Sequence, residues 1–352
     1  MVAHLLWEQE AVGSSPTTPT TCSDLPSKEQ DVVIGVPNDD IFVAIAAYRE
    51  PELRRTIEQC IDAAAHPERL HFGVCLQYEP DGPPETGRDC LSGISADIRQ
   101  VSYRWTESKG GCWARHRAQG LYAGEGFTMQ IDAHMRMADR WDRSLVDQMS
   151  TLASDKPLIT GQCPLYDVVD GVDVFPEESS VPVTVFERIV PEGWIWHPGV
   201  TRPDIPSHRR PTRVLSGGFV FTLGVWNREV RQDPDHLYTG EELALSIRSF
   251  TCGYDFWNPD HVVAWHRHHP QGNRKYIHDG DTSEVSMRDE RAYRRLRMLH
   301  AGDPDRVLLP YSTGTARSVS EYHAWAGVDT STWTVSHDAR TGATPAQFVP
   351  SW

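Results

Sequence analysis

The chain has 352 residues, which is enough for one large α/β domain or two small ones. Its net charge of −15 and its lack of a dense basic run argue against nucleic acid and against a membrane as partners. No stretch approaches the ~20 consecutive apolar residues of a membrane span, and the N-terminus lacks the basic and apolar segments of a signal peptide. Seven scattered cysteines without a C-x-x-C pattern fit free thiols, so we expect a cytoplasmic protein.

Residues 1–40 have the composition of a leader rather than of a folded domain. The run 14–21 consists of Ser, Thr and Pro, a low-complexity pattern that is not expected to pack. Residues 2–16 also resemble the conceptual translation of a tRNA gene. We therefore expect a disordered leader over 1–40 and a native start that lies later, before Ile41.

Strands and helices alternate in the first part of the fold. Residues 41–47 form a short apolar run typical of a strand buried on both faces, and further strands are predicted over 70–76, over 126–131 and, as a shorter one, over 98–103. Apolar residues at helical spacing predict helices over 51–63, where Pro51 stands at the first helical position, and over 112–122. This alternation predicts a parallel sheet, and in such sheets ligands bind beyond the carboxyl ends of the strands.

The second part of the chain is less regular. Residues 165–213 are rich in Pro, Val and Trp without helical spacing, so we expect long loops and edge hairpins there. A strand is predicted over 214–221, a helix with an acidic start over 241–250, and a last strand over 262–265. The tail after residue 300 shows no clear periodicity.

The strand that ends in Asp132-Ala133-His134 carries the most informative motif. Side chains alternate along a strand, so Asp132 and His134 lie on the same side of the chain, where both can bind a metal. On its own, the motif is more simply interpreted as a strand end followed by a polar turn. The motifs farther along the chain favour the metal-site interpretation.

Three further blocks follow along the chain: Ser216-Gly217-Gly218, Gly240-Glu241-Glu242-Leu243 and, after Cys252-Gly253, His266. This order resembles that of the polypeptide N-acetylgalactosaminyltransferases. Residues 41–53, 130–136 and 240–243 are more similar still to the cytoplasmic N-acetylglucosaminyltransferases that modify hydroxyproline on polypeptides. Two features depart from the galactosaminyl family: Glu242 replaces its Asn, and no lectin-like C-terminal domain is evident.

The resemblance implies an α/β architecture of the GT-A (nucleotide-diphospho-sugar transferase) fold, with a Rossmann-like, mostly parallel sheet and helices on both faces. It implies a catalytic domain over 41–300 and a C-terminal extension over 301–352 that packs on it or is partly disordered. The implied activity is metal-dependent, retaining transfer of N-acetylglucosamine from UDP-GlcNAc to an acceptor hydroxyl, for which a peptide or protein is one candidate.

The resemblance also implies a metal site. Its ligands would be Asp132, His134 and His266, with His268 as the substitute for His266. A carboxylate and two imidazoles suit Mn²⁺ (or Mg²⁺), which would offset the charge on the departing UDP. Alternatively, His266 belongs to an exposed polar cluster with His268 and His269.

The nucleotide contacts are implied in the same way. Ala46, Ala47 and Tyr48 end the first predicted strand and would border the uracil. Arg115 would lie near the nucleotide, because a guanidinium binds phosphate and uracil oxygens through paired donors. The alternatives are ordinary core packing for Tyr48 and a solvated helix face for Arg115.

The sugar would be contacted by the glycine pair and by two glutamates. Gly217 and Gly218 would let it lie against bare backbone, whereas Glu241 and Glu242 would hold its hydroxyls as catalytic candidates. The alternatives are a bulge for the glycines and charges that complement a helix dipole for the glutamates. Three aromatic residues of the overhanging segment are weaker candidates for stacking on sugar or acceptor: Trp194, Trp196 and His197.

Other functions remain compatible with these residues. One is a transferase that uses UDP-GalNAc or UDP-Glc on a small-molecule or glycan acceptor. A metal-dependent hydrolase and a non-catalytic sugar-nucleotide binding protein are alternatives from other classes. Binding of UDP in the presence of Mn²⁺ separates a transferase from a hydrolase, and donor turnover separates an enzyme from a binding protein.

Overall fold

A computed structural model describes the following residues: 38–177, 180–202, 204, 210–238, 240–267, 279 and 282–346. The leader predicted over 1–40 lies almost entirely outside the described residues, and so does His268. Among the helices of the described part, none is long and apolar enough to cross a membrane.

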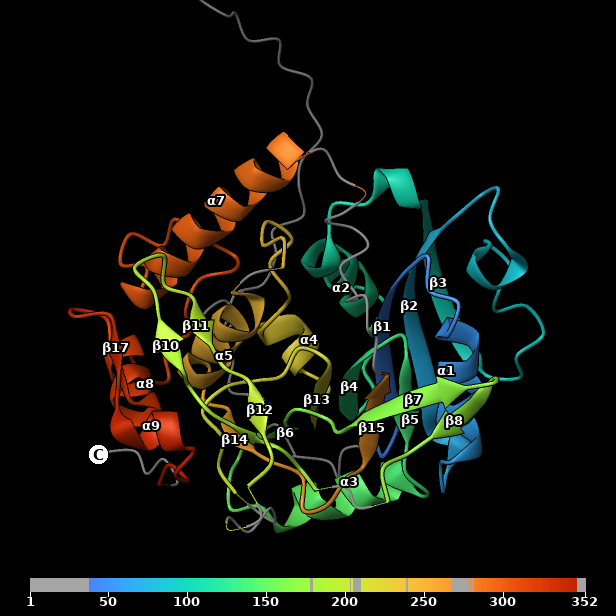
Figure 1. Cartoon of the computed structure of the whole chain (residues 1–352), viewed down its shortest axis with the longest axis horizontal. Coiled ribbons are helices and arrows are strands. Elements are labelled where there is room, and N and C mark those ends of the chain that lie inside the picture. The colour runs from blue at the N-terminus through green and yellow to red at the C-terminus, as the bar shows by residue number, and fades with distance from the viewer. Residues whose placement is uncertain are drawn as a thin grey trace, which may run out of the picture.

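The centre of the molecule is a seven-stranded sheet with strand order β14-β6-β13-β4-β1-β2-β3 (Figure 1). Its strands are β1 Ile41–Tyr48, β2 Leu70–Tyr78, β3 Asp97–Arg104, β4 Phe127–Asp132, β6 Pro157–Thr160, β13 Phe219–Leu223 and β14 Asp255–Trp257. Strands β3, β2, β1 and β4 run parallel to one another, as β6 does to β14, and β13 runs antiparallel to both of its neighbours. The prediction of a mostly parallel α/β sheet is confirmed.

Helices cover both faces of this sheet because the central strand is apolar on both sides. Val43 points to the face covered by α1 (Leu53–Asp62), whereas its neighbour Phe42 points to the face covered by α2 (Gly111–Gln119). The remaining helices of the described part are α3 Trp141–Thr151, α4 Trp226–Glu229, α5 Glu241–Thr251, α7 Thr282–His300, α8 Val319–Ala326 and α9 His337–Thr341. Short 3-10 helices span Pro67–Arg69, Pro84–Thr86 and Trp105–Glu107.

A second, four-stranded sheet has the order β5-β15-β7-β8. Its strands are β5 Met135–Met137, β7 Leu165–Val169, β8 Val172–Val174 and β15 Ala264–Arg267. Two small hairpin sheets pair β9 Val183–Thr184 with β12 Gly199–Val200 and β10 Arg188–Ile189 with β11 Ile195–Trp196. The expected loops and edge hairpins between 165 and 213 are therefore present.

Several predicted boundaries were wrong, each for a physical reason. The first helix begins at Leu53 rather than Pro51, which lies in a turn. The strand expected over 214–221 begins only at Phe219. Leu215 is buried against α5 and lies outside the strand, so its apolar character reflects this packing. The strand expected over 262–265 lies two residues later, in the second sheet.

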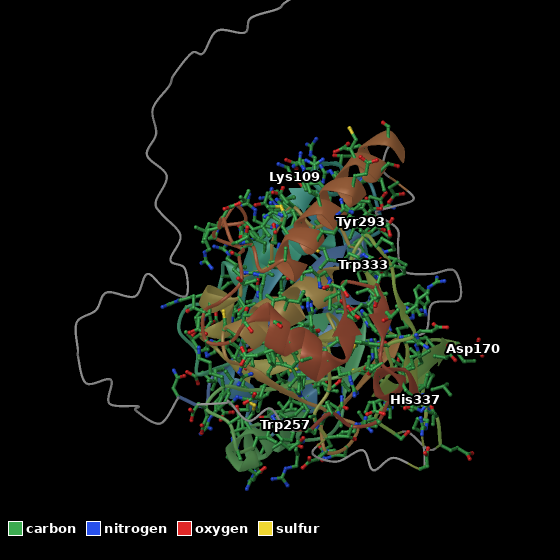
Figure 2. The ribbon with its side chains drawn as sticks, turned by 90° about the vertical axis from the view of Figure 1, so that its left-hand side faces the viewer. Lys109, Asp170, Trp257, Tyr293, Trp333 and His337 are labelled. Carbon is green, nitrogen blue, oxygen red and sulfur yellow. The ribbon has the colours of Figure 1, made fainter. Side chains whose placement is uncertain are left out.

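The C-terminal elements pack against the rest of the fold although their sequence lacks clear periodicity. Tyr322 of α8 is fully buried, stacks edge-on against Phe250 of α5 and donates a hydrogen bond to Arg213 O at 3.0 Å. A short hairpin joins β16 Val328–Asp329 to β17 Thr334–Val335. Figure 2 views this side of the molecule and labels Lys109, whose carbonyl accepts a hydrogen bond of 2.8 Å from Arg288 of α7.

Candidate functional site

The candidate residues gather at the carboxyl edge of the central sheet. Asp132 is the last residue of β4 and is paired with Ala46 of β1, so the two strand ends lie side by side. Ala47 is fully buried, and Tyr48 ends β1 with its hydroxyl donating to Asp279 Oδ2 at 3.1 Å. The ends of β1 and β4 therefore form one edge, as the parallel topology predicts.

Asp132, His134 and His266 converge on one point. Their candidate ligand atoms all lie within 4.8 Å of one another. His134 Nε2 and His266 Nε2 are 3.0 Å apart, and His266 Nε2 is 3.4 Å from Asp132 Oδ2. Two ligand atoms roughly 2.1 Å from one ion are separated by about 3 Å when they subtend a right angle, so this donor set fits a divalent cation.

The second sheet brings the two histidines together. His134 immediately precedes β5, and His266 lies in β15, where it pairs with Met135. The backbone amide of Arg267 donates to the His134 carbonyl at 3.1 Å, which locks this register. The two imidazole rings meet edge to face at a centroid separation of 4.6 Å. Residues far apart in the sequence thus form one cluster through strand pairing.

Arg115, on α2, holds two carboxylates of the site. Its Nη2 donates to Asp132 Oδ1 at 2.7 Å, and its Nη1 donates to Glu241 Oε1. Burial raises the pKa of the Asp132 carboxyl, but the Arg115 guanidinium and a hydrogen bond from His266 outweigh it and hold that pKa well below its usual range. Asp132 is consequently ionised, which is the form that binds a cation.

Two thiols lie near the same carboxylates. Burial raises the pKa of Cys112, with Glu241 adding to the effect, and burial raises the pKa of Cys163, with Asp132 adding to it. Both are therefore neutral thiols at ordinary pH in the metal-free protein. All cysteines in the described residues are free.

Gly217 and Gly218 form a tight turn before β13 rather than part of the strand. The turn is closed by a hydrogen bond from Phe219 N to Ser216 O at 3.1 Å, and Gln130 of β4 donates to Gly217 O at 2.8 Å. A Cβ at Gly217 would lie 2.5 Å from Arg115 Nη1, and one at Gly218 would lie 2.8 Å from an Asp132 oxygen. A side chain at either position would therefore displace Arg115 or Asp132 from its present place.

Glu241 and Glu242 begin α5 but face different surroundings. The Glu241 side chain is 5% exposed and accepts hydrogen bonds from Arg115 and from Gln232. The Glu242 side chain is 29% exposed; its Oε1 accepts from Gly217 N at 2.7 Å, and its Oε2 lies 3.2 Å from His197 Nε2. Of the two, Glu242 is the carboxylate within reach of a ligand from solvent.

The sequence interpretation did not single out two of these contacts. Glu50, just after β1, places its Oε2 3.3 Å from His134 Nδ1, and no spacing in the sequence signals this pairing. His197 was considered only for stacking, whereas the structure places its ring against Glu242.

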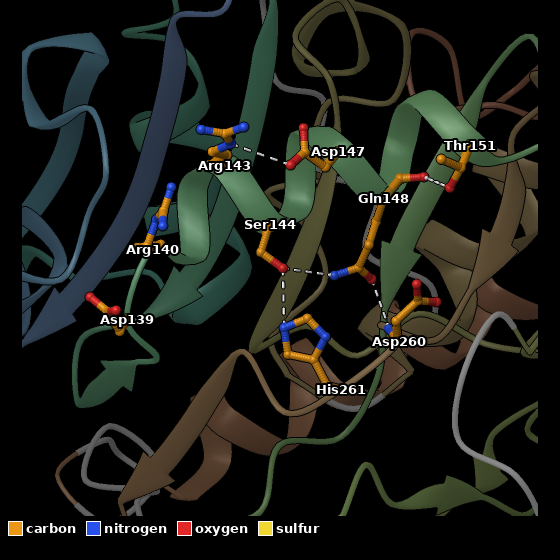
Figure 3. A pocket seen from close by; sticks show the side chains of 9 residues that line it. All are labelled: Asp139, Arg140, Arg143, Ser144, Asp147, Gln148, Thr151, Asp260 and His261. Atoms are coloured by element: carbon orange, nitrogen blue, oxygen red, sulfur yellow. Dashed lines mark hydrogen bonds and ion pairs between the residues drawn. The ribbon is translucent and has the colours of Figure 1, made fainter.

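A separate cavity of about 480 Å³ lies beside α3 and shares no residue with this cluster (Figure 3). Its lining includes Ser144, which is 3.1 Å from His261 Nε2, together with acidic and basic side chains in similar numbers. We assign the functional site to the sheet edge rather than to this open surface cavity.

Comparison with solved structures shows the fold. GalNAc-T7, in a structure with UDP, GalNAc and Mn²⁺, matches with a TM-score of 0.55 at 13% identity, over 81% of this chain and 54% of that chain. The chain thus spans about half the length of that protein. TarS from S. aureus in complex with UDP-GlcNAc has a TM-score of 0.41 at 13% identity, over 69% of this chain and 61% of that chain. The mannosyltransferase PcManGT from Pyrobaculum calidifontis, in complex with GDP-Man and Mn²⁺, has a TM-score of 0.44 at 16% identity, over 85% of this chain and 79% of that chain.

Comparison of the sequence with protein families gives the assignment. No curated protein matches the chain. The family model described as Glycosyltransferase (GlcNAc) matches residues 40–93 and 88–332, which is most of the chain. Together with the GT-A fold shared with GalNAc-T7, this match establishes that the chain belongs to the GlcNAc glycosyltransferase family.

Proposed function

We propose that the protein transfers N-acetylglucosamine from UDP-GlcNAc to a hydroxyl group on a polypeptide, with a divalent cation and with retention of anomeric configuration. One observation supports this most strongly: Asp132, His134 and His266 converge at the carboxyl edge of the sheet. The GT-A fold shared with GalNAc-T7, whose structure holds UDP and Mn²⁺, agrees with a nucleotide-sugar donor. The peptide acceptor and the retention follow from the resemblance to the hydroxyproline-modifying family.

Asp132, His134 and His266 would hold Mn²⁺ or Mg²⁺ through one carboxylate oxygen and two ring nitrogens. When bound, the cation would supply positive charge against the diphosphate and act as a Lewis acid on the departing UDP. Arg115 would keep Asp132 in place through its 2.7 Å hydrogen bond and add a permanent positive charge beside the diphosphate.

The donor's two ends would lie on opposite sides of the metal ligands. Ala46 and Tyr48 at the end of β1 would border the uracil, with the small side chain of Ala46 next to Asp132, whereas Ala47 is fully buried and would support this edge from the core. Glu242 would accept hydrogen bonds from sugar hydroxyls beside the Gly217–Gly218 turn, since its carboxylate is oriented by Gly217 N and by His197. Glu241 would act through Arg115, with which it is hydrogen bonded.

The proposal also covers the division of the chain into a catalytic domain and a C-terminal extension. We propose that the catalytic domain spans 41–300 and that the segment 301–352 is an extension packed on it. The contact of Tyr322 in α8 with Phe250 in α5 supports this packing. It also links the extension to the candidate site, because α5 carries Glu241 and Glu242 at its start. Cleavage throughout 301–352 in limited proteolysis, at the rate of an unstructured segment, would contradict the packing of this extension.

The function can be tested with purified protein and a panel of UDP-GlcNAc, UDP-GalNAc and UDP-Glc. Release of UDP would be measured with Mn²⁺ or with EDTA, and with peptides that contain hydroxyproline, serine or threonine. We expect release with UDP-GlcNAc, Mn²⁺ and a peptide acceptor, and an NMR coupling constant in the product that shows retention. Preference for another donor, inversion, hydrolysis independent of any acceptor, or binding without turnover would each contradict the corresponding part of the proposal.

A further inference from the structure

Glu50 lies directly behind one of the candidate metal ligands. The chain leaves β1 at Tyr48, and Arg49 turns it with a positive φ of 45°, which brings the next residue back towards β4. Glu50 is only 7% exposed. Its Oε1 accepts a hydrogen bond from the Glu52 amide at 3.2 Å, and its Oε2 lies 3.3 Å from His134 Nδ1. Each carboxylate oxygen therefore faces a nitrogen.

A buried carboxylate is unfavourable unless it is hydrogen bonded or paired with a positive charge. Next to an imidazole, it favours the tautomer whose facing nitrogen carries the proton. In His134 that nitrogen is Nδ1, so the lone pair is left on Nε2. Nε2 is also the atom that faces His266 Nε2 at 3.0 Å, in the centre of the ligand cluster.

We propose that Glu50 is a positioning residue of the metal centre: it fixes the tautomer and the ring orientation of His134 and makes Nε2 a stronger donor to a cation. The inference deepens the proposed function and rests on its metal site. The family resemblance assigns Asp132, His134 and His266 to the metal site; Glu50 lies within the resembling residues 41–53, but its role comes from the geometry alone.

Two of the proposed ligands thus have a charged residue behind them. Asp132 accepts a hydrogen bond through its second oxygen from the cationic Arg115, and the second nitrogen of His134 faces a carboxylate oxygen of Glu50 at 3.3 Å. Each contact favours one orientation of its ligand, which would arrange the site before a cation binds.

The test compares Glu50→Gln with the matched control Glu79→Gln. Glu79 follows β2 at the same sheet edge and pairs with Arg49 at 3.3 Å, so its replacement removes an equal charge from a position away from the ligands. Mn²⁺ affinity would be measured from the electron paramagnetic resonance signal of free Mn²⁺. We expect about 10–100-fold weaker binding for Glu50→Gln, the size seen when such outer partners are removed, and a change below about twofold for Glu79→Gln.

Two further readouts separate positioning from a general structural role. In metal-free protein, nitrogen NMR should show His134 protonated at Nδ1 in the wild type and a mixture of tautomers in Glu50→Gln. Transfer by the variant should show a raised KM for Mn²⁺ with kcat restored at saturating Mn²⁺. The Mn²⁺ affinity of Glu50→Asp, which keeps the charge, should lie between that of the wild type and that of Glu50→Gln. Glu50→Asp replaces Glu50→Gln in the test if the latter does not fold.

Wild-type Mn²⁺ affinity together with an unchanged His134 tautomer in Glu50→Gln would overturn the role of Glu50 and leave the proposed function standing. Loss of kcat that saturating Mn²⁺ does not restore would also overturn it. If the wild type itself binds no Mn²⁺, the metal site fails, and both this inference and the metal-dependent part of the proposed function are overturned together.

Discussion

Replacement of Gly218 by alanine tests whether the position of Asp132 matters for cation binding. A Cβ at Gly218 would lie 2.8 Å from Asp132 Oδ2, which is 0.6 Å closer than the 3.4 Å at which ordinary contact begins. The carboxylate cannot move away freely, because its Oδ1 accepts a hydrogen bond from Arg115 at 2.7 Å. The backbone is not strained by the change, since Gly218 is not among the residues with positive φ. The substitution should therefore act on Asp132 and not on the fold.

The expected displacement of about 0.6 Å exceeds the tolerance of metal–ligand distances, which is roughly 0.2 Å. We expect Mn²⁺ affinity to fall about 10–100-fold, similar to the loss of an outer-shell partner, with an unchanged melting temperature. Titration of Mn²⁺ followed by electron paramagnetic resonance measures the affinity. The control is Gly111→Ala at the start of α2, where a Cβ would meet no atom within 4 Å. Equal Mn²⁺ affinity in the two variants would show that cation binding does not depend on the position of Asp132.

Three other changes have distinct expected outcomes. His134→Ala removes a proposed ligand at a strand end, so Mn²⁺-dependent UDP binding should be lost while the circular dichroism spectrum is kept; unchanged turnover would defeat the metal assignment. Glu242→Gln removes a charge-assisted acceptor worth ~1.5–3 kcal/mol, so transfer should fall about 10–100-fold while UDP binds as before, and an equal loss of both would place Glu242 in the nucleotide site. Arg136→Met removes a guanidinium that is 1% exposed and pairs with Glu52 and Asp173, so urea unfolding should show a loss of about 3 kcal/mol; a loss below 1 kcal/mol would mean that the carboxylates find other partners.

Strand β4, which carries Asp132, its neighbour β1 and the first helices were predictable from local pattern. The run that forms β1 is apolar on both faces, and such a run identifies a buried strand of a parallel sheet without knowledge of its neighbours. The helix beginning at Glu241 was equally clear, because apolar residues recur at helical spacing after two acids.

What local pattern could not give was the pairing between distant segments. Val214 and Leu215 look like strand residues, yet they are apolar because they pack beneath α5. The contact of Glu50 with His134 depends on the turn at Arg49 and on the pairing of β1 with β4. Neither can be inferred from the spacing of residues in the sequence. The C-terminal helices showed no periodicity for a similar reason, since α8 is short and owes its place to buried aromatic contacts.

The proposed function depends most directly on a cation between Asp132, His134 and His266 when the donor is bound. Crystals grown with Mn²⁺ and UDP-GlcNAc, with data collected at the manganese absorption edge, would locate that cation by anomalous scattering. We predict one strong peak within about 2.0–2.3 Å of Asp132 Oδ2, His134 Nε2 and His266 Nε2, with diphosphate oxygens completing its coordination. Bound UDP-GlcNAc with no peak at these three atoms, or with the peak elsewhere, would contradict the proposed metal site.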